Sequence, residues 1–205
     1  MARKKAVWVG IDSGKTGGVA AIFVNGSTER AVLDAEAWHT PSITTRTKRP
    51  RKKTPAGNPS YKVETVYDLY GMLRLMNEFQ ALPAANWEVH IALELQRPRQ
   101  RDSKHVAMMV GYGQALWEMA VAANGLTSHL ELLAPTVWKP VYLPPKADKK
   151  ASLALGRELF PSVDMPLEKD EAKAEALLIA DYIRRRDLGV PFLRERPAPK
   201  KRKKK

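Results

Sequence analysis

Short apolar runs and segments of helical periodicity alternate along the chain, and this pattern predicts the fold. Apolar runs predict strands at 6–12, 17–26, 28–38, 87–96 and 129–135, and Asn25-Gly26 marks the turn after the second. Apolar positions at helical spacing predict helices at 62–82, 103–125, 148–160 and 170–186. Three strands, then helix, strand, helix, strand and two helices indicate an α/β fold with a mixed five-stranded sheet flanked by helices.

The remaining segments divide the chain around one domain at 6–187. Residues 39–61 are polar, basic and rich in Pro and Thr, which predicts a long, mobile basic loop inside that domain. A basic arm at 1–5 precedes the domain, and a basic tail at 188–205 follows it. A chain of 205 residues with 44% hydrophobic content is long enough to bury one sizeable core.

Composition narrows the classes of protein to consider. The chain has no Cys, which excludes disulfides and thiolate metal sites. No apolar run reaches the length of a membrane span, and the opening MARKK is not followed by the apolar region of a secretory signal. We therefore expect a soluble protein of the bacterial cytoplasm.

The net charge of +13 predicts a polyanionic partner. Three basic runs, at 3–5, 46–53 and 200–205, hold 15 of the 35 cations, which leaves 20 basic against 22 acidic residues elsewhere. Such runs favour contact with the DNA backbone through counterion release, and Arg49, Arg51 and Lys52 are candidates. The alternative is a solvated run that adheres without specificity. The final lysines also match a nuclear address, which is a weak motif.

The stretch VGIDSGKT (9–16) is similar to a phosphate-binding loop but does not satisfy its rules. A Walker A loop has four residues between its glycines, whereas only three separate Gly10 from Gly14. Such a loop also opens a helix, and here a predicted strand follows. A nucleotide role for Lys15 is thereby excluded, although Lys15 remains a candidate for contact with DNA.

Four carboxylates occupy positions where an unpaired charge is costly. Asp12 and Glu94 end apolar strands, and Glu171 and Glu175 share one face of the last helix. Four such acids suit a site for two Mg²⁺ ions that cleaves a phosphodiester. Simpler roles are a turn-capping Asp12, an exposed Glu94 at a sheet edge, and an acidic first helical turn in which Asp170 is the N-cap.

Three motifs in this order resemble the RuvC family of Holliday junction resolvases, particularly its phage-type members. They are GIDSGKTGGVA, IALELQ and DKKASLALGRELFP…KDEAKAEALLIADYIRR, and the similarity spans about residues 6–186. The resemblance implies a ribonuclease H-like fold, a homodimer, a phage-encoded source, and roles in DNA recombination and repair. It also implies paired nicks in opposed strands of a four-way junction, dependent on Mg²⁺ or Mn²⁺, that leave a 5′-phosphate and a 3′-hydroxyl.

The resemblance assigns roles to individual residues. Asp12 matches the first family acid, Glu94 the second, and Glu175 the acid before the Ala-Leu run. The remaining acid matches best at Glu171, where the phage-type pattern usually has Asp. Asp170 stands where a His is frequent, which leaves the choice between Asp170 and Glu171 open.

Several basic residues are candidates for contact with DNA. Lys149 and Lys150 fall near family lysines that meet the scissile backbone, although a solvated helix start explains them equally well, and Lys146 lies just before them. Arg97 stands where cellular resolvases carry an aromatic wedge, so base unstacking is expected to differ. Arg97, Arg99 and Arg101 offer phosphate contacts instead, unless they form an exposed basic loop.

Other functions share parts of this pattern. The Asp-Gly opening also occurs in sugar kinases and actin-like ATPases, which need a second lobe that 205 residues cannot supply. A non-catalytic DNA-binding module would not need all four acids, and a ribonuclease that cuts RNA–DNA hybrids would use the same fold. The helix at 103–125 is apolar enough to cover the sheet and also a second subunit, core packing being the commoner reason.

Overall fold

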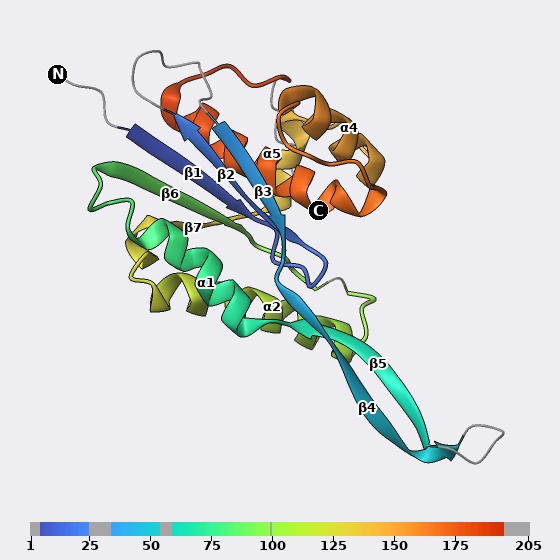
Figure 1. Ribbon diagram of the computed structural model, residues 1–205. Coiled ribbons are helices and arrows are strands. Elements are labelled where there is room, and N and C mark those ends of the chain that lie inside the picture. Colours follow the sequence, from blue (N-terminus) through green and yellow to red (C-terminus); the bar gives the residue numbers. More distant parts are fainter. Residues whose placement is uncertain (1–4, 25–33, 54–58, 99, 195–205) are drawn as a thin grey trace, which may run out of the picture.

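The computed structural model, which describes residues 5–24, 34–53, 59–98 and 100–194, confirms the mixed five-stranded sheet (Figure 1). The sheet has the order β3-β2-β1-β6-β7. Its strands are β1 (Lys5–Ile11), β2 (Gly18–Val24), β3 (Asp34–His39), β6 (Trp87–Glu94) and β7 (Leu130–Leu133). Residues 28–33 of the third predicted strand lie outside the described residues.

Strand directions place the ends of β1 and β6 side by side. The β1 strand is antiparallel to β2 and parallel to β6, and β7 is parallel to β6. In the register, Ile11 is paired with Leu93. The residues that follow them, Asp12 and Glu94, therefore emerge together at the same edge of the sheet.

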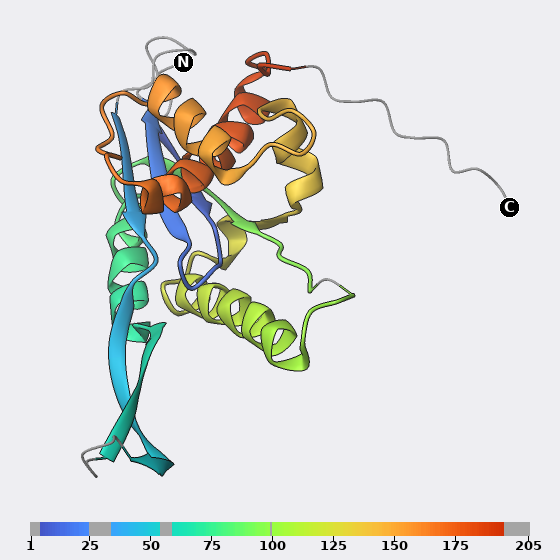
Figure 2. The same cartoon turned by 90° about the vertical axis from the view of Figure 1, so that its right-hand side faces the viewer.

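Helices cover both faces of the sheet (Figures 1 and 2). The α1 helix (Leu69–Gln80) and α2 (Lys104–Ala123) lie on one face, and α4 (Lys149–Leu159) and α5 (Glu171–Leu188) lie on the other. The connections contain η1 (Thr127–His129), α3 (Pro135–Trp138), η2 (Lys139–Val141) and η3 (Glu168–Asp170). Side chains of Asp68, Ser103 and Asp148 cap the starts of α1, α2 and α4.

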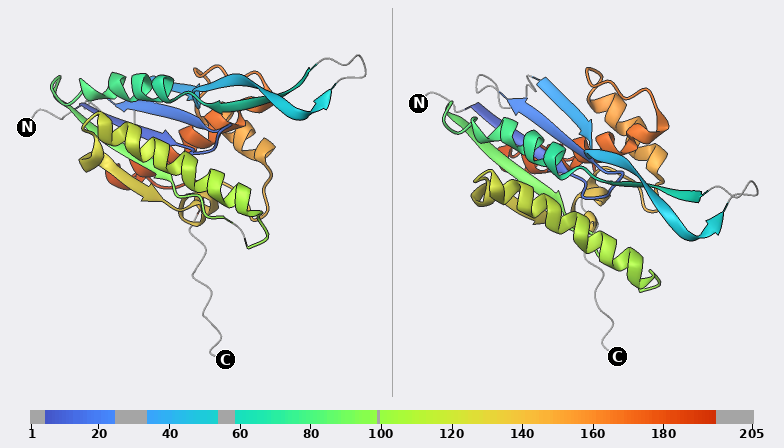
Figure 3. Two further views of the ribbon diagram at one scale, coloured as in Figure 1. Left: turned by 90° about the horizontal axis from the view of Figure 1, so that it is seen from below. Right: turned by 60° about the horizontal axis from the view of Figure 1, so that its bottom comes forward.

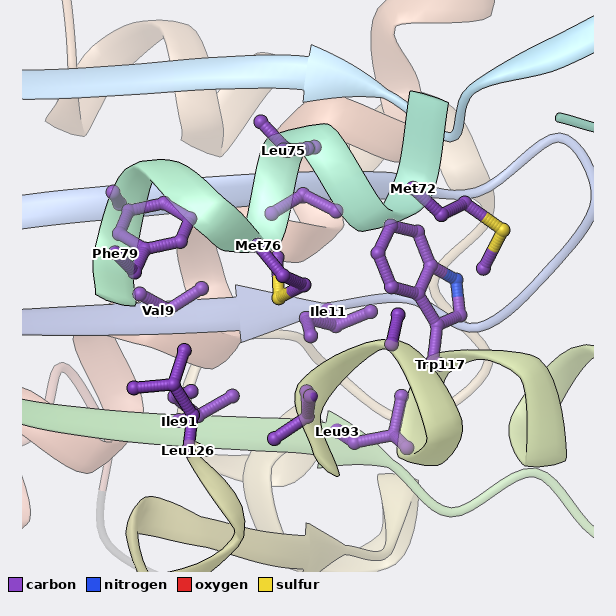
Figure 4. Close-up of a cluster of buried hydrophobic side chains, with 14 of the residues drawn as sticks. Val9, Ile11, Met72, Leu75, Met76, Phe79, Ile91, Leu93, Trp117 and Leu126 are labelled. Atoms are coloured by element: carbon purple, nitrogen blue, oxygen red, sulfur yellow. The ribbon is translucent and has the colours of Figure 1, made fainter. Parts of the chain in front are cut away.

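The alternation of side chains along β1 explains why this strand is apolar throughout. Val7, Val9 and Ile11 face α1 and α2, where Met76 and Trp117 are fully buried (Figure 4). Ala6 and Trp8 belong to the cluster on the opposite face, which includes residues of α5. Because both faces are covered, every β1 residue after Lys5 is buried.

The α5 helix lies unusually close to the sheet at Gly10. A Cβ atom at Gly10 would lie 2.1 Å from the carbonyl oxygen of Ala176 and 2.6 Å from the backbone nitrogen of Ala180. A Cβ atom at Gly18 would lie 2.6 Å from the carbonyl oxygen of Ala172. Glycine on the strands and alanine on the helix therefore allow the two backbones to approach closely.

The prediction of a loop at 39–61 is wrong. The structure has a long hairpin there, formed by β4 (Ser42–Lys53) and β5 (Pro59–Tyr67), which extends beyond the sheet (Figure 3). The sequence alternates Thr, Val and Tyr with charged residues, which suits a solvated strand pair even without an apolar face. The helix predicted from residue 62 consequently begins at Leu69, so Val66 is in a strand.

The boundaries of the domain, arm and tail remain predictions, and residues 1–4 and 195–205 lie outside the described residues. Among the residues described, no helix combines the length and apolar character needed to cross a membrane.

We expect Gly10→Ala to destabilise the fold by about 1–3 kcal/mol or more, because the added methyl group meets the backbone of α5, which cannot move without shifting the whole helix. The measurement is urea unfolding followed by circular dichroism. The matched control is Ala20→Gly, which removes a methyl group at the position paired with Gly10. The close approach is not a constraint if Gly10→Ala costs less than Ala20→Gly.

Candidate active site

Asp12 lies in the turn between β1 and β2. Its backbone N–H donates to the carbonyl of Gly18 at 2.9 Å, and its Oδ1 accepts from the N–H of Gly14 at 3.1 Å. The turn-capping role is therefore present. The same Oδ1 also accepts from Nε2 of Gln96 at 2.8 Å, so the carboxylate additionally contacts the segment that follows β6.

Glu94 is buried, with 3% of its surface exposed, so it is not the edge-exposed glutamate considered above. The indole Nε1 of Trp138 donates to its Oε1 at 3.1 Å, and Nε2 of Gln96 lies 3.4 Å from its Oε2. Burial and then the negative charge of Asp12 raise the pKa of Glu94 to about 7, although Lys139 opposes the rise. The protonated form of this carboxyl group is thus favoured by its burial and by the neighbouring acid.

Glu175 reaches the same region from the second turn of α5. The ammonium Nζ of Lys139 donates to both carboxylate oxygens at 3.1 and 3.2 Å, and Oγ of Ser152 donates to Oε1 at 3.1 Å. The same Nζ lies 4.0 Å from Oε1 of Glu94. The negative charge of Glu175 contributes to the raised pKa of Glu94. Asp12, Glu94 and Glu175 are therefore neighbours, linked through Gln96 and Lys139.

Asp170 and Glu171 have different surroundings. The Asp170 carboxylate is buried and accepts from the N–H of Leu167 at 2.8 Å, while Nε2 of His39 lies 2.9 Å from its Oδ1 and Lys173 3.6 Å. Burial opposes ionisation, but the Leu167 N–H and His39 outweigh it and keep the pKa of Asp170 below its usual value. Asp170 therefore holds the start of the helix to β3, although its side chain caps η3 and not α5.

Glu171 is half-buried and opens α5, one turn before Glu175. The adjacent residue Ala172 packs against Gly18, whose carbonyl accepts from the N–H of Asp12. The position of Glu171 is thus at the same edge of the sheet as the other three candidate acids.

The chemistry of these side chains fits a hard divalent cation. All four candidates supply carboxylate oxygens, which Mg²⁺ prefers. Burial and then the charge of Asp12 raise the pKa of Glu94, and a cation bound beside Glu94 would favour its charged form. As the side chains stand, no three His, Asp or Glu residues in the described parts of the chain are grouped closely enough to hold a metal ion. Lys139 provides the positive charge between Glu94 and Glu175, so a cation bound there would compete with its ammonium group.

Four residues that contact the acids were not among the sequence candidates: Gln96, Trp138, Lys139 and Ser152. Gln96 gave a signal, because it is a polar residue at the end of the apolar strand predicted at 87–96. Trp138 and Lys139 lie in the proline-studded segment between β7 and α4, where no periodicity indicates which side chains face the site.

The basic candidates differ in their exposure and in the segments that carry them. Lys15 is half-buried three residues after Asp12, and Arg97 and Arg101 are exposed after β6. Lys150 is exposed and pairs with Glu168 at 3.5 Å. Lys146 is exposed and lines a hollow of about 640 Å³ with Lys139. The backbones of Arg49, Arg51 and Lys52 lie in β4 and that of Lys149 begins α4, whereas Arg99 lies outside the described residues.

Comparison with known proteins identifies the fold. The structure of T. thermophilus RuvC in complex with Holliday junction substrate is similar over 91% of this chain and 98% of that chain, with a TM-score of 0.51 and 16% sequence identity. A second structure, Thermus thermophilus RuvC, covers the same shares with a TM-score of 0.44 and 15% identity. No protein-family profile and no curated protein sequence matches the chain. The chain therefore has a RuvC-like, ribonuclease H-like fold.

We expect Asp170→Asn and Glu171→Gln to separate a structural acid from a metal-binding one. Asp170→Asn weakens bonds to the Leu167 N–H, His39 and Lys173, so it should lower the free energy of unfolding by roughly 1–3 kcal/mol. Glu171→Gln should cost less stability but weaken Mn²⁺ binding at least several-fold. Urea unfolding in EDTA and calorimetric titration with Mn²⁺ measure the two effects, and the opposite pattern would make Asp170 the ligand.

Proposed function

We propose that this protein is a metal-dependent endonuclease that cuts branched DNA, with the four-way junction as its main substrate. The observation that carries the proposal is the meeting of Asp12, Glu94 and Glu175 at one edge of a RuvC-like sheet. These acids come from β1, β6 and α5, which are far apart in the sequence. A purely structural role does not explain why three carboxylates gather where their mutual repulsion is unfavourable.

The proposed site divides its tasks among this chain's own residues. Asp12, Glu94, Glu171 and Glu175 would hold two Mg²⁺ ions, or Mn²⁺ in their place. Bound there, the ions would activate water and stabilise the charge that develops on the phosphate, leaving a 5′-phosphate and a 3′-hydroxyl. Trp138 orients Glu94 through its indole N–H. Lys139 pairs with Glu175 in the structure, and once displaced from it by a bound cation its ammonium group would bring a positive charge beside the reacting phosphate.

Binding of DNA is supported by cations on the same side of the molecule as the acids. The β4–β5 hairpin carries the basic run at 46–53 away from the sheet, as an arm that tracks a DNA backbone would (Figure 3). Exposed Arg97 and Arg101 follow the strand that ends in Glu94. These contacts raise affinity without reading sequence.

A homodimer is proposed because two opposed strands need two sites, and α2 carries an exposed surface suited to pairing. Met108, Tyr112 and Met119 are 62%, 48% and 49% exposed and follow one another at helical spacing. The exposed residues Gly111 and Ala115 lie between them, and a Cβ atom at Gly111 would meet nothing within 4 Å. Small residues flanked by large apolar ones allow two helices to pack closely.

The cleavage test uses end-labelled four-way junction, Y-fork, linear duplex and RNA–DNA hybrid, each with Mg²⁺, Mn²⁺ or EDTA. We expect paired, symmetric nicks in the junction that disappear in EDTA and fall at least 10³-fold in Asp12→Asn and Glu175→Gln, because each variant removes an oxygen ligand's charge. Selective cleavage of the hybrid would instead identify a ribonuclease. Tight binding without any cut would leave a DNA-binding module and overturn the catalytic roles.

For the dimer, we expect Met119→Glu to convert the protein into monomers, because it places two carboxylates in the contact. Sedimentation velocity measures the mass, and circular dichroism checks the fold. Tyr70→Glu is the matched control, since Tyr70 is 71% exposed on the neighbouring helix α1. An unchanged mass in Met119→Glu, or equal loss in both variants, contradicts this interface.

A further inference from the structure

A groove opens beside the candidate acids, between four segments that are distant in the sequence. Its walls are the turn at 13–15, the base of the hairpin at 64–67, Gln96, and the first turns of α2 at 105–110. The hollow measures about 340 Å³, which lies within the range of sites for small ligands. Gln96 also donates to Asp12 at 2.8 Å, so the groove begins one side chain away from the site.

One wall of the groove is firmly held. The hydroxyl of Tyr67 donates to the carbonyl of Ser13 at 3.2 Å, and its ring makes an edge contact with Tyr112. A Cβ atom at Gly113 would lie 2.2 Å from the Tyr67 hydroxyl, so α2 packs directly against this side chain. Met109 and Val110 add apolar surface to the lining. The wall is thus fixed by these contacts and partly apolar, properties that suit the binding of a planar aromatic group.

The charges in the lining favour an anion. Lys15 and His105 both line the groove, and among the lining residues the acid is Glu64. Glu64 is already paired with Lys62, and that bond, followed by the charges of Lys15 and His105, lowers the pKa of Glu64. A phosphate group at this place would therefore meet the ammonium group of Lys15, the imidazole of His105, and an acid that is already paired with a lysine.

We propose that this groove binds one unpaired nucleotide of the DNA strand next to the cleaved phosphate, with its base against Met109, Val110 and Tyr67 and its phosphate near Lys15. The proposal rests on the proposed function for the location of the cleaved phosphate. A hollow of this size accepts a single nucleotide but not a base pair, so only a strand that has opened can use it. Branched DNA supplies such strands at lower cost than linear duplex, because pairing is already weakened at the branch.

The groove would therefore favour branched DNA over linear duplex without the need for an aromatic wedge. Arg97 occupies the position where cellular resolvases are expected to carry that wedge, and it is exposed. Selection by the groove would act after the strand has opened, by holding the unpaired nucleotide, and not by forcing the bases apart.

The first experiment compares Thr65→Glu with Thr44→Glu in the Asp12→Asn background, so that binding is measured without cleavage. Thr65 lines the groove, whereas Thr44 is its exposed cross-strand partner outside the lining. A glutamate at either position should therefore have a similar effect on the stability of the hairpin. Fluorescence anisotropy with a Y-fork should show 5- to 10-fold weaker binding for Thr65→Glu and less than 2-fold for Thr44→Glu. Equal losses in the two variants would overturn the proposal.

The second measurement places 2-aminopurine at successive positions of the unpaired arm. A change in its fluorescence on binding is expected at one position only, and Thr65→Glu should abolish it while Thr44→Glu retains it. No change at any position overturns the groove proposal, whatever the nicking assay shows. A groove-dependent signal in a protein that never cuts DNA would support the groove and overturn the nuclease function, so the two failures are distinguishable.

Discussion

The close approach of α5 to the sheet is the constraint on which the candidate site depends. At Gly10 and Gly18 the strands have no side chain, and Ala172, Ala176 and Ala180 present the smallest surface that a helix can offer apart from glycine. The first turns of α5 can therefore lie directly over the C-terminal end of β1 and the start of β2. A larger side chain at either contact would lift the helix and carry Glu171 and Glu175 away from Asp12.

This packing brings three acidic side chains together at one edge of the sheet. Parallel pairing of β1 with β6 places Asp12 beside Glu94, and the close helix adds Glu175 from the face of the sheet that α5 covers. The cost is electrostatic, since burial and the charge of Asp12 raise the pKa of Glu94. Hydrogen bonds from Trp138 and Gln96 and the positive charge of Lys139 offset part of that cost. The acids are thus kept close by a fold that holds them against their own repulsion.

The surroundings of this edge are as important for the proposed function as the acids themselves. The hairpin extends the molecule beyond the sheet, and the groove at its base joins the turn after β1 to the start of α2. The exposed stripe on α2 lies on the same helix that walls the groove. In the proposed function, the binding of DNA and the pairing of subunits would therefore both involve α2.

The sequence by itself determined the sheet, the helices that cover it and the positions of the candidate acids. Runs such as AVWVGI, buried on both faces, and the alanine-rich start of α5 carry local signals that need no knowledge of the fold. It did not determine the hairpin at 42–67, because this segment is polar and rich in basic residues, Thr and Pro, a composition that is also typical of loops. Nor did it indicate the contacts of Asp170 with His39 or those of Lys139 with Glu175. These interactions join residues 131 and 36 positions apart, so only the tertiary structure decided that His39 is a partner of Asp170 and that Lys139 is a partner of Glu175.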